Sequence, residues 1–223
     1  MLMFPRSLAL GSLLLAALVA APHAQAADPE SKYYVTAIAG WATQGSQDLA
    51  YSAPGVSRTV NAPLDSGFLT GAAIGRRLSE HWRLEGEFIY QSVDLPTLSL
   101  GAGGPSGDGN YASTSIAING LYDFDLFGSK RARSYAGLGA VYLTEVDIDF
   151  EQGATERSFS GSKGALQVLL GVRYDLGARA FLDVGLRYLV ASNIELDAES
   201  PAVGRIRADY EPLAVTAAFG WKF

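Results

Sequence analysis

The charged side chains that could do chemistry in this chain fall on one phase of alternating segments, opposite the large apolar residues. Five members of this set are acidic and five are basic. Isolated charges in a confined interior would be costly, whereas paired ones can be accommodated. The pattern therefore predicts a structural ion network. Its members are Arg77, Arg83, Glu85, Glu87, Asp123, Arg173, Asp175, Asp183, Arg187 and Lys222.

The position of these charges along their strands leaves an alternative open for some of them. Arg77, Arg83, Asp123 and Lys222 fall near the ends of predicted strands, where they could instead lie at a water-facing rim. The other predicted network members lie deeper in their segments. Among these, Glu85, Glu87, Arg173 and Arg187 are the strongest candidates for internal pairing.

Catalytic candidates are few. The chain has two histidines, His23 in a predicted leader and His81 in a predicted turn. A barrel enzyme that remodels lipid with a serine needs a histidine general base beside it near the outer rim. No Gly-x-Ser-x-Gly sequence occurs, and the Glu85–Glu87 pair is expected to face arginines. We predict no enzymatic activity, no cofactor and no catalytic metal.

A second group of carboxylates alternates with apolar residues at 146, 148 and 150: Glu145, Asp147, Asp149 and Glu151. If the alternating segments described below form a barrel in the outer membrane, this alternation predicts that one strand continues beyond the membrane as an extracellular hairpin. Carboxylates on one face could hold Ca²⁺ or Mg²⁺ weakly, since these hard cations prefer oxygen ligands. The alternative is a solvated face that keeps the hairpin soluble.

Eight alternating segments must position these side chains. The clearest, 165–176, sets Leu166, Val168 and Leu170 against Gln167 and Gly171. Glycines at 137 and 139 blur the phase of the fifth segment, for which we favour an outward face at 136, 138, 140 and 142. The segments are expected at about 33–42, 67–78, 82–92, 111–124, from 135, 165–176, 181–191 and 213–223.

The connections between segments alternate in length. Short turns at 79–81, 125–131 and 177–179 alternate with long loops at 43–66, 93–110, 145–163 and 192–209. Short turns on one side and long loops on the other are typical of outer-membrane barrels. A soluble periplasmic barrel is the structural rival, but it would bury its apolar face. We predict an all-β fold, an eight-stranded antiparallel transmembrane up-and-down β-barrel.

The amino terminus indicates export. Arg6, the apolar run 8–21 and Ala24-Gln25-Ala26 form a signal-peptide pattern, so we expect a cleaved signal peptide at 1–26 and a barrel domain at 27–223. There is no cysteine for a lipid anchor, and the net charge of −6 argues against nucleic acid as a partner. The expected location is the cell outer membrane.

Three short stretches resemble opacity-type, OmpA-like outer-membrane proteins: Gly71–Tyr90, Asn119–Phe124 and Gly220–Phe223. Arg76 departs from the pattern, because an aromatic residue is common there. The resemblance implies an eight-stranded barrel of the OmpA/OmpX type. It also implies delivery by the barrel-assembly machinery, which recognises a C-terminal aromatic strand. The matching residues are Phe219, Trp221 and Phe223.

These observations favour a non-enzymatic integral outer-membrane protein with a structural or surface-recognition role, like that of an adhesin or antigen. Its expected partners are outer-membrane lipids, lipopolysaccharide, the assembly machinery and an extracellular ligand that no residue specifies. The alternative is a narrow pore or a lateral transporter for small hydrophobic solutes. An outer-leaflet lipid-modifying enzyme is the third hypothesis.

Overall fold

The computed structural model describes residues 32–101, 104–129, 131–152 and 155–223. The predicted leader, residues 1–26, lies outside them. The described residues form β1 (Tyr33–Thr43), β2 (Gln47–Ala53), β3 (Val56–Ala62), β4 (Ser66–Arg77), β5 (Trp82–Ser99), β6 (Ser106–Phe124), β7 (Ala132–Gln152), β8 (Thr155–Asp175), β9 (Ala180–Ala198), β10 (Arg205–Tyr210) and β11 (Leu213–Lys222).

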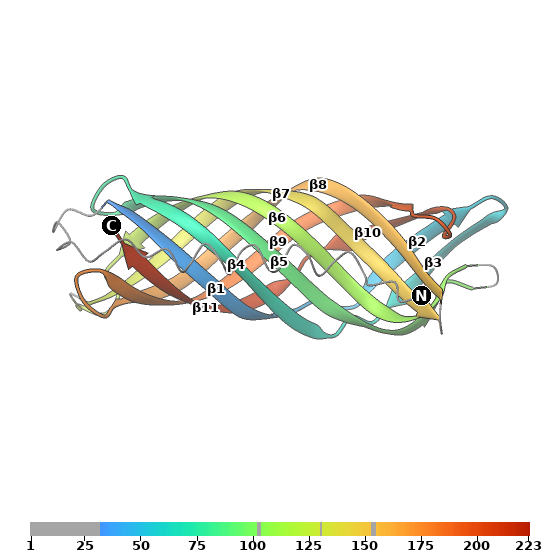
Figure 1. Ribbon diagram of the computed structural model, residues 1–223, viewed down its shortest axis with the longest axis horizontal. Helices are drawn as coiled ribbons and strands as arrows, with labels where there is room; N and C mark the ends of the chain where they lie inside the picture. Colours follow the sequence, from blue (N-terminus) through green and yellow to red (C-terminus); the bar gives the residue numbers. More distant parts are fainter. Residues whose placement is uncertain (1–31, 102–103, 130, 153–154) are drawn as a thin grey trace, which may run out of the picture.

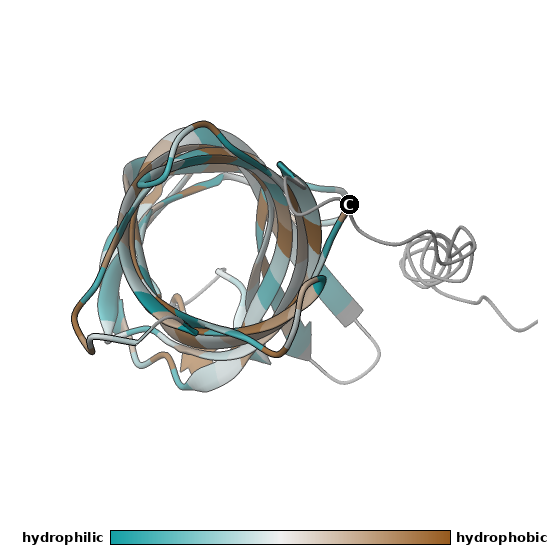
Figure 2. Ribbon diagram, turned by 90° about the vertical axis from the view of Figure 1, so that its left-hand side faces the viewer, coloured by the Kyte–Doolittle hydropathy of each residue, from teal (hydrophilic) through white to brown (hydrophobic). Residues whose placement is uncertain are grey.

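Eight of these strands close into a ring. The order β1-β4-β5-β6-β7-β8-β9-β11 is antiparallel throughout, and β11 pairs with both β9 and β1. The end-on view shows the closed wall (Figure 2). Short turns and the C-terminus share one end, and the β2–β3 hairpin projects from the other (Figure 1). The predicted eight-stranded barrel is confirmed. No helix among the described residues is long and apolar enough to cross a membrane.

The long connections contain more strand than the sequence indicated. The span 43–66 was expected to be a loop but holds β2 and β3, and 192–209 holds the end of β9 and all of β10. The spans 93–110 and 145–163 are mostly extensions of β5 to β8. The loop predictions for 43–66 and 93–110 were wrong because the ladders continue beyond the length that crosses a bilayer, whereas the hairpin expected from the alternation at 145–151 is confirmed by β7 and β8.

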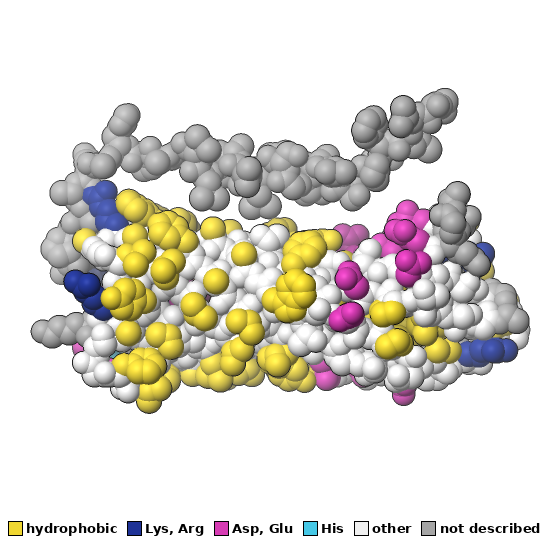
Figure 3. All heavy atoms as spheres, turned by 90° about the horizontal axis from the view of Figure 1, so that it is seen from below, with side chains coloured by type: hydrophobic (Ala, Val, Ile, Leu, Met, Phe, Trp, Pro, Cys, Tyr) yellow, Lys and Arg dark blue, Asp and Glu magenta, His cyan; other side chains and the backbone are white. Residues whose placement is uncertain are grey.

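The outward face of the ring is apolar along its membrane-spanning part. Leu138, Leu166 and Ile118 expose 64–70% of their surface, and apolar side chains spread over this part of the barrel (Figure 3). The expected outward phase of every ring strand is confirmed, including Leu138 and Tyr142 in β7.

Aromatic side chains border this apolar band at both edges. At the short-turn edge, Trp82 and Tyr122 have ring centroids 5.1 Å apart. At the other edge, Trp41 lies opposite Phe68, whose ring is 5.9 Å from that of Tyr90. Such girdles mark the two membrane–water interfaces of an outer-membrane barrel.

Beyond the outer girdle the alternation reverses. Val146, Ile148 and Phe150 point inward and are at most 1% exposed, while Glu145 and Asp147 face out. A bulge in β7 places Thr144 and Glu145 together on the outside. The wall above the membrane is bathed in water, so it buries its apolar residues as a soluble barrel does.

Candidate functional site

The interior of the membrane-spanning part holds three ion clusters, of which the first two are linked, and the first is centred on Arg83 of β5. The Arg83 side chain is 1% exposed, and its Nε lies 2.9 Å from both carboxylate oxygens of Asp123. Its Nη1 donates to Tyr34 Oη at 3.0 Å and to Glu85 Oε1 at 2.8 Å. Arg83 and Glu85 reach the same lumen because residues two apart on a strand share a face.

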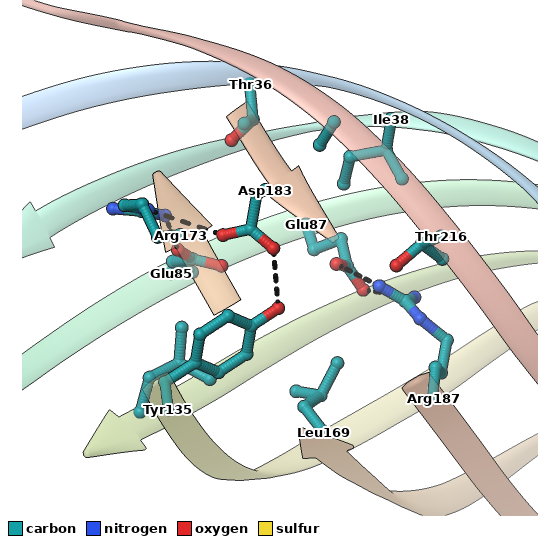
Figure 4. Close-up of a pocket in the computed structure, with 12 residues that line it drawn as sticks. Thr36, Ile38, Glu85, Glu87, Tyr135, Leu169, Arg173, Asp183, Arg187 and Thr216 are labelled. Atoms are coloured by element: carbon teal, nitrogen blue, oxygen red, sulfur yellow. Dashed lines mark hydrogen bonds and ion pairs between the residues drawn. The ribbon is translucent and has the colours of Figure 1, made fainter. Parts of the chain in front are cut away.

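The second cluster is centred on Arg173 of β8. Its Nε donates to Asp183 Oδ2 at 3.3 Å, and its Nη2 lies 3.4 Å from Glu85 Oε1, which links this cluster to the first. Tyr135 donates to the other oxygen of Asp183 at 2.7 Å (Figure 4). The Arg173 guanidinium also lies 3.8 Å from the centroid of the Phe181 ring, a cation–π contact.

The third cluster lies deeper in the membrane. Arg187 of β9 reaches across the lumen to Glu87 of β5 in a bidentate pair, with distances of 2.7 and 2.6 Å (Figure 4). Gln167 donates to Glu87 at 3.3 Å and to Asn119 at 2.6 Å. Paired, hydrogen-bonded charges of this kind are the form in which ions are tolerated in a protein interior.

The predicted network is thus largely brought together, with differences at the short-turn end. Arg83 and Asp123 are buried, so the rim alternative is wrong for them. Lys222 pairs with Asp175 at 2.5 Å, and both side chains are partly buried, at 14% and 26% exposed. Arg77 was placed in the network, but it forms no ion pair within the described residues, whereas its neighbour across the ladder, Arg83, binds both oxygens of Asp123.

Several neutral residues of the interior were not expected to bond there: Tyr34, Tyr135 and Asn119, together with Gln167, whose inward phase alone was predicted. They lie on the inward phase of their strands, but without a charge they did not stand out. A signal was present in the facing glycines. A Cβ added to Gly171 would lie 2.4 Å from Tyr135 Oη, so this glycine leaves the space that the ring fills.

The upper lumen is filled by neutral polar and apolar side chains in place of ion pairs. Tyr210 accepts hydrogen bonds from Gln91 at 3.0 Å and Ser113 at 2.8 Å, forming a neutral polar layer above the ions. Above it lies an apolar core that includes Tyr111 and Phe150, each at most 1% exposed. Among the ion clusters the structure has a cavity of about 30 Å³ (Figure 4), enough for about two water molecules.

The outer face of the extension carries the predicted acidic row, and acidic side chains gather there beyond the apolar band (Figure 3). Burial raises the pKa of Asp147 to about 7, and the charges of Asp149 and Glu145 act in the same direction. The possible weak cation site is not formed: within the described part of the chain no three histidine, cysteine or acidic side chains are arranged to hold a metal ion. Outward residues on one strand are spaced along it and do not converge.

The remaining sequence candidates lie at the short-turn end. His81 is exposed in the turn before β5 and stacks on Tyr122, with centroids 5.7 Å apart. The C-terminal aromatic residues Phe219, Trp221 and Phe223 face outward, 44–57% exposed, on β11 and directly after it.

A model of the outer membrane protein beta-barrel domain matches residues 11–223. The chain belongs to this family. It is an integral outer-membrane protein, in agreement with the apolar band and the aromatic girdles. No protein with curated annotation matches the sequence.

Two solved structures are similar in fold. The outer membrane protein OprG from Pseudomonas aeruginosa gives a TM-score of 0.59 at 19% identity, covering 86% of this chain and 96% of that chain. Neisserial surface protein A (NspA) gives a TM-score of 0.52 at 19% identity, covering 86% of this chain and 97% of that one. At this identity both similarities show the barrel fold alone.

Proposed function

We propose that this protein is a non-enzymatic surface-recognition barrel, anchored in the outer membrane and presenting a rigid extracellular extension. The observation that carries the proposal is the double closure of the interior. Ion pairs fill the membrane-spanning part, and an apolar core fills the extension. A barrel filled in this way serves as a scaffold, and recognition in such proteins usually lies on loops held by a rigid frame.

Outer-membrane lipids and lipopolysaccharide are the proposed partners of the apolar band. The barrel-assembly machinery is the proposed partner of Phe219, Trp221 and Phe223, whose exposed side chains are accessible to a receptor before membrane insertion. The export signal at residues 1–26 completes this route. An extracellular ligand is the proposed partner of the extension.

The first test asks whether the lumen is closed and the extension exposed. In planar bilayers the purified protein should give no conductance steps. Because the chain has no cysteine, Ser57→Cys in β3 and Glu80→Cys in a short turn form a matched pair. On intact cells an impermeant maleimide should label only Ser57→Cys, and the reverse would overturn the orientation.

The second test addresses recognition itself. Cells that express the barrel are screened for adhesion to immobilised glycans and matrix proteins, and compared with cells expressing a variant that lacks residues 47–62. The ring strands do not include this hairpin. A variant that still shows a heat-dependent gel shift but no longer adheres supports the proposal. Equal adhesion by cells with no barrel at all refutes it.

One observation favours a second candidate, a lateral route for small hydrophobic solutes. The β8–β9 ladder is irregular between Ser160 and Leu166, so residues 161–165 have no ladder partner on β9, although Gly161 still lies against the backbone of Glu195. The interior at this level is apolar, with Leu143 and Ala191 buried. Lys163 bridges the interruption by donating to the Asn193 carbonyl at 3.2 Å.

A glycine offers a test of this route. A Cβ at Gly164 would meet nothing within 4 Å, and the same holds for Gly177 in a periplasmic turn. Gly164→Phe should therefore obstruct the interruption without strain, and Gly177→Phe is its control. If proteoliposomes take up a small apolar dye equally with both variants, this candidate is removed.

A further inference from the structure

The outer mouth of the barrel contains a second cavity, of about 100 Å³. It is lined by residues of β2, β8 and the β9–β10 connection and by Pro105, just before β6, so residues far apart in the sequence meet there. An engineered apolar cavity of about 150 Å³ binds benzene, so this space is close to the size of a single aromatic ring. Its lining residues are Tyr51, Pro105, Arg157, Phe159, Pro201, Ala202 and Val203.

The walls of this mouth cavity are rigid and aromatic. Tyr51 and Phe159 are at most 1% exposed and meet edge to face, with centroids 6.2 Å apart. Phe150 packs against the other side of Phe159 at the same distance. Tyr51 Oη donates to the Val203 carbonyl at 2.9 Å, which fixes the ring to the connection that forms the lip. Aromatic walls held in this way favour a flat apolar guest.

One cation faces into the mouth cavity. Arg157 lies directly opposite Phe150 in the β7–β8 ladder, and opposed residues share a face, so Arg157 points inward with Phe150 and Phe159. Arg157 forms no ion pair with any carboxylate of the described residues, whereas Arg205 and Arg207 on the outer flank are both paired. The nearest acids in the ladder, Glu156 beside Arg157 in sequence and Glu151 opposite Glu156, are exposed.

We propose that the mouth cavity binds a small aromatic carboxylate. The ring of the guest packs against the Tyr51–Phe159 pair, whose own rings stay in edge-to-face contact, and the carboxylate accepts two hydrogen bonds from the Arg157 guanidinium, whose planar fork matches it. The acidic side chains of the outer flank repel anions elsewhere on the extension. The negative charge of the guest is therefore recognised at Arg157. The inference rests on the proposed function, because it names a ligand class for the extracellular end.

The test uses the full barrel, purified from outer membranes and placed in lipid nanodiscs. Benzoate, benzyl alcohol and benzylamine are titrated by calorimetry or ligand-observed NMR. Benzoate should bind saturably and about tenfold or more tightly than benzyl alcohol, since a charge-assisted pair contributes about that factor. Benzylamine should not bind. Equal binding of all three, or none by benzoate, overturns the inference.

Two variants and one control locate the site. Arg157→Gln should lower benzoate affinity about tenfold and abolish the preference for the acid, while Ala202→Leu should fill the cavity and weaken all guests. Arg205→Gln makes the same chemical change on the outer flank and should leave binding unchanged. Unaltered benzoate affinity in Arg157→Gln refutes the site. The benzoate titration uses purified protein and the adhesion test uses cells. Loss of benzoate binding and loss of adhesion are therefore separate outcomes.

Discussion

Breaking the Arg187–Glu87 pair should be among the most destabilising single changes in the membrane-spanning lumen. Both side chains are at most 8% exposed, and both carboxylate oxygens of Glu87 accept from Arg187. In Arg187→Gln, Glu87 keeps only the bond from Gln167 at 3.3 Å. A buried charge left without its partner costs about 3–5 kcal/mol.

The cavity beside Glu87 decides where in this range the cost falls. Its volume of about 30 Å³ has room for about two waters. Water that hydrates the unpaired carboxylate lowers the penalty, so we expect about 3 kcal/mol. The same substitution at Arg205, whose side chain is 50% exposed, should cost about 0–1 kcal/mol.

Guanidinium unfolding in lipid vesicles measures the difference, with tryptophan emission as the signal. The three tryptophans, Trp41, Trp82 and Trp221, all face outward and leave the bilayer on unfolding. The double variant Glu87→Leu with Arg187→Met removes both charges and should recover most of the loss. If it is no more stable than Arg187→Gln, lost packing and not an unpaired charge sets the cost, and the reasoning fails.

Three further predictions follow from the two environments of the wall. Leu170→Lys places a charge against lipid and should cost roughly 2–4 kcal/mol in the same unfolding assay, and a neutral result would refute the assigned phase. The folded state disfavours the Asp147 carboxylate, whose pKa rises from 3.8 to about 7. The free energy of unfolding should therefore fall as pH rises through that window, and Asp147→Asn should flatten the pH profile. Phe223→Ala should reduce the heat-modifiable, assembled fraction on gels, and an unchanged fraction would remove the proposed assembly role.

The ring could be predicted from the sequence because lipid on one face and a narrow lumen on the other impose period two on every strand. Leu166, Leu170 and their counterparts fixed the outward phase without knowledge of the partner strands. The pairing of Arg187 with Glu87 could not be predicted. These residues come from strands that are not neighbours in the ring, so their contact depends on the tilt and stagger of the whole barrel.

The extension was harder to predict because its strands also alternate at period two, but their apolar residues face the interior and not the lipid. In β7 the apolar residues stay on even positions, from Leu138 and Tyr142 to Ile148 and Phe150. The first pair faces lipid and the second faces the interior. If the outward phase of Leu138 and Tyr142 is continued along β7, Ile148 and Phe150 are placed in water. For this reason the apolar core of the extension was not expected.

The reversal has a local cause in two strands, β7 and β9. One extra residue in β7, at Thr144, turns the strand over at the outer membrane boundary. In β9 the extra residue falls between Ala191 and Ile194, where Asn193 has a φ of 54°, a conformation that asparagine tolerates. The intervening strand, β8, keeps one phase and loses its pairing with β9 over residues 161–165. The interruption in the wall thus follows from neighbouring strands changing face where β8 does not. In β7 and β9 the bulges therefore mark the level at which the outward face of the wall changes from lipid contact to water contact.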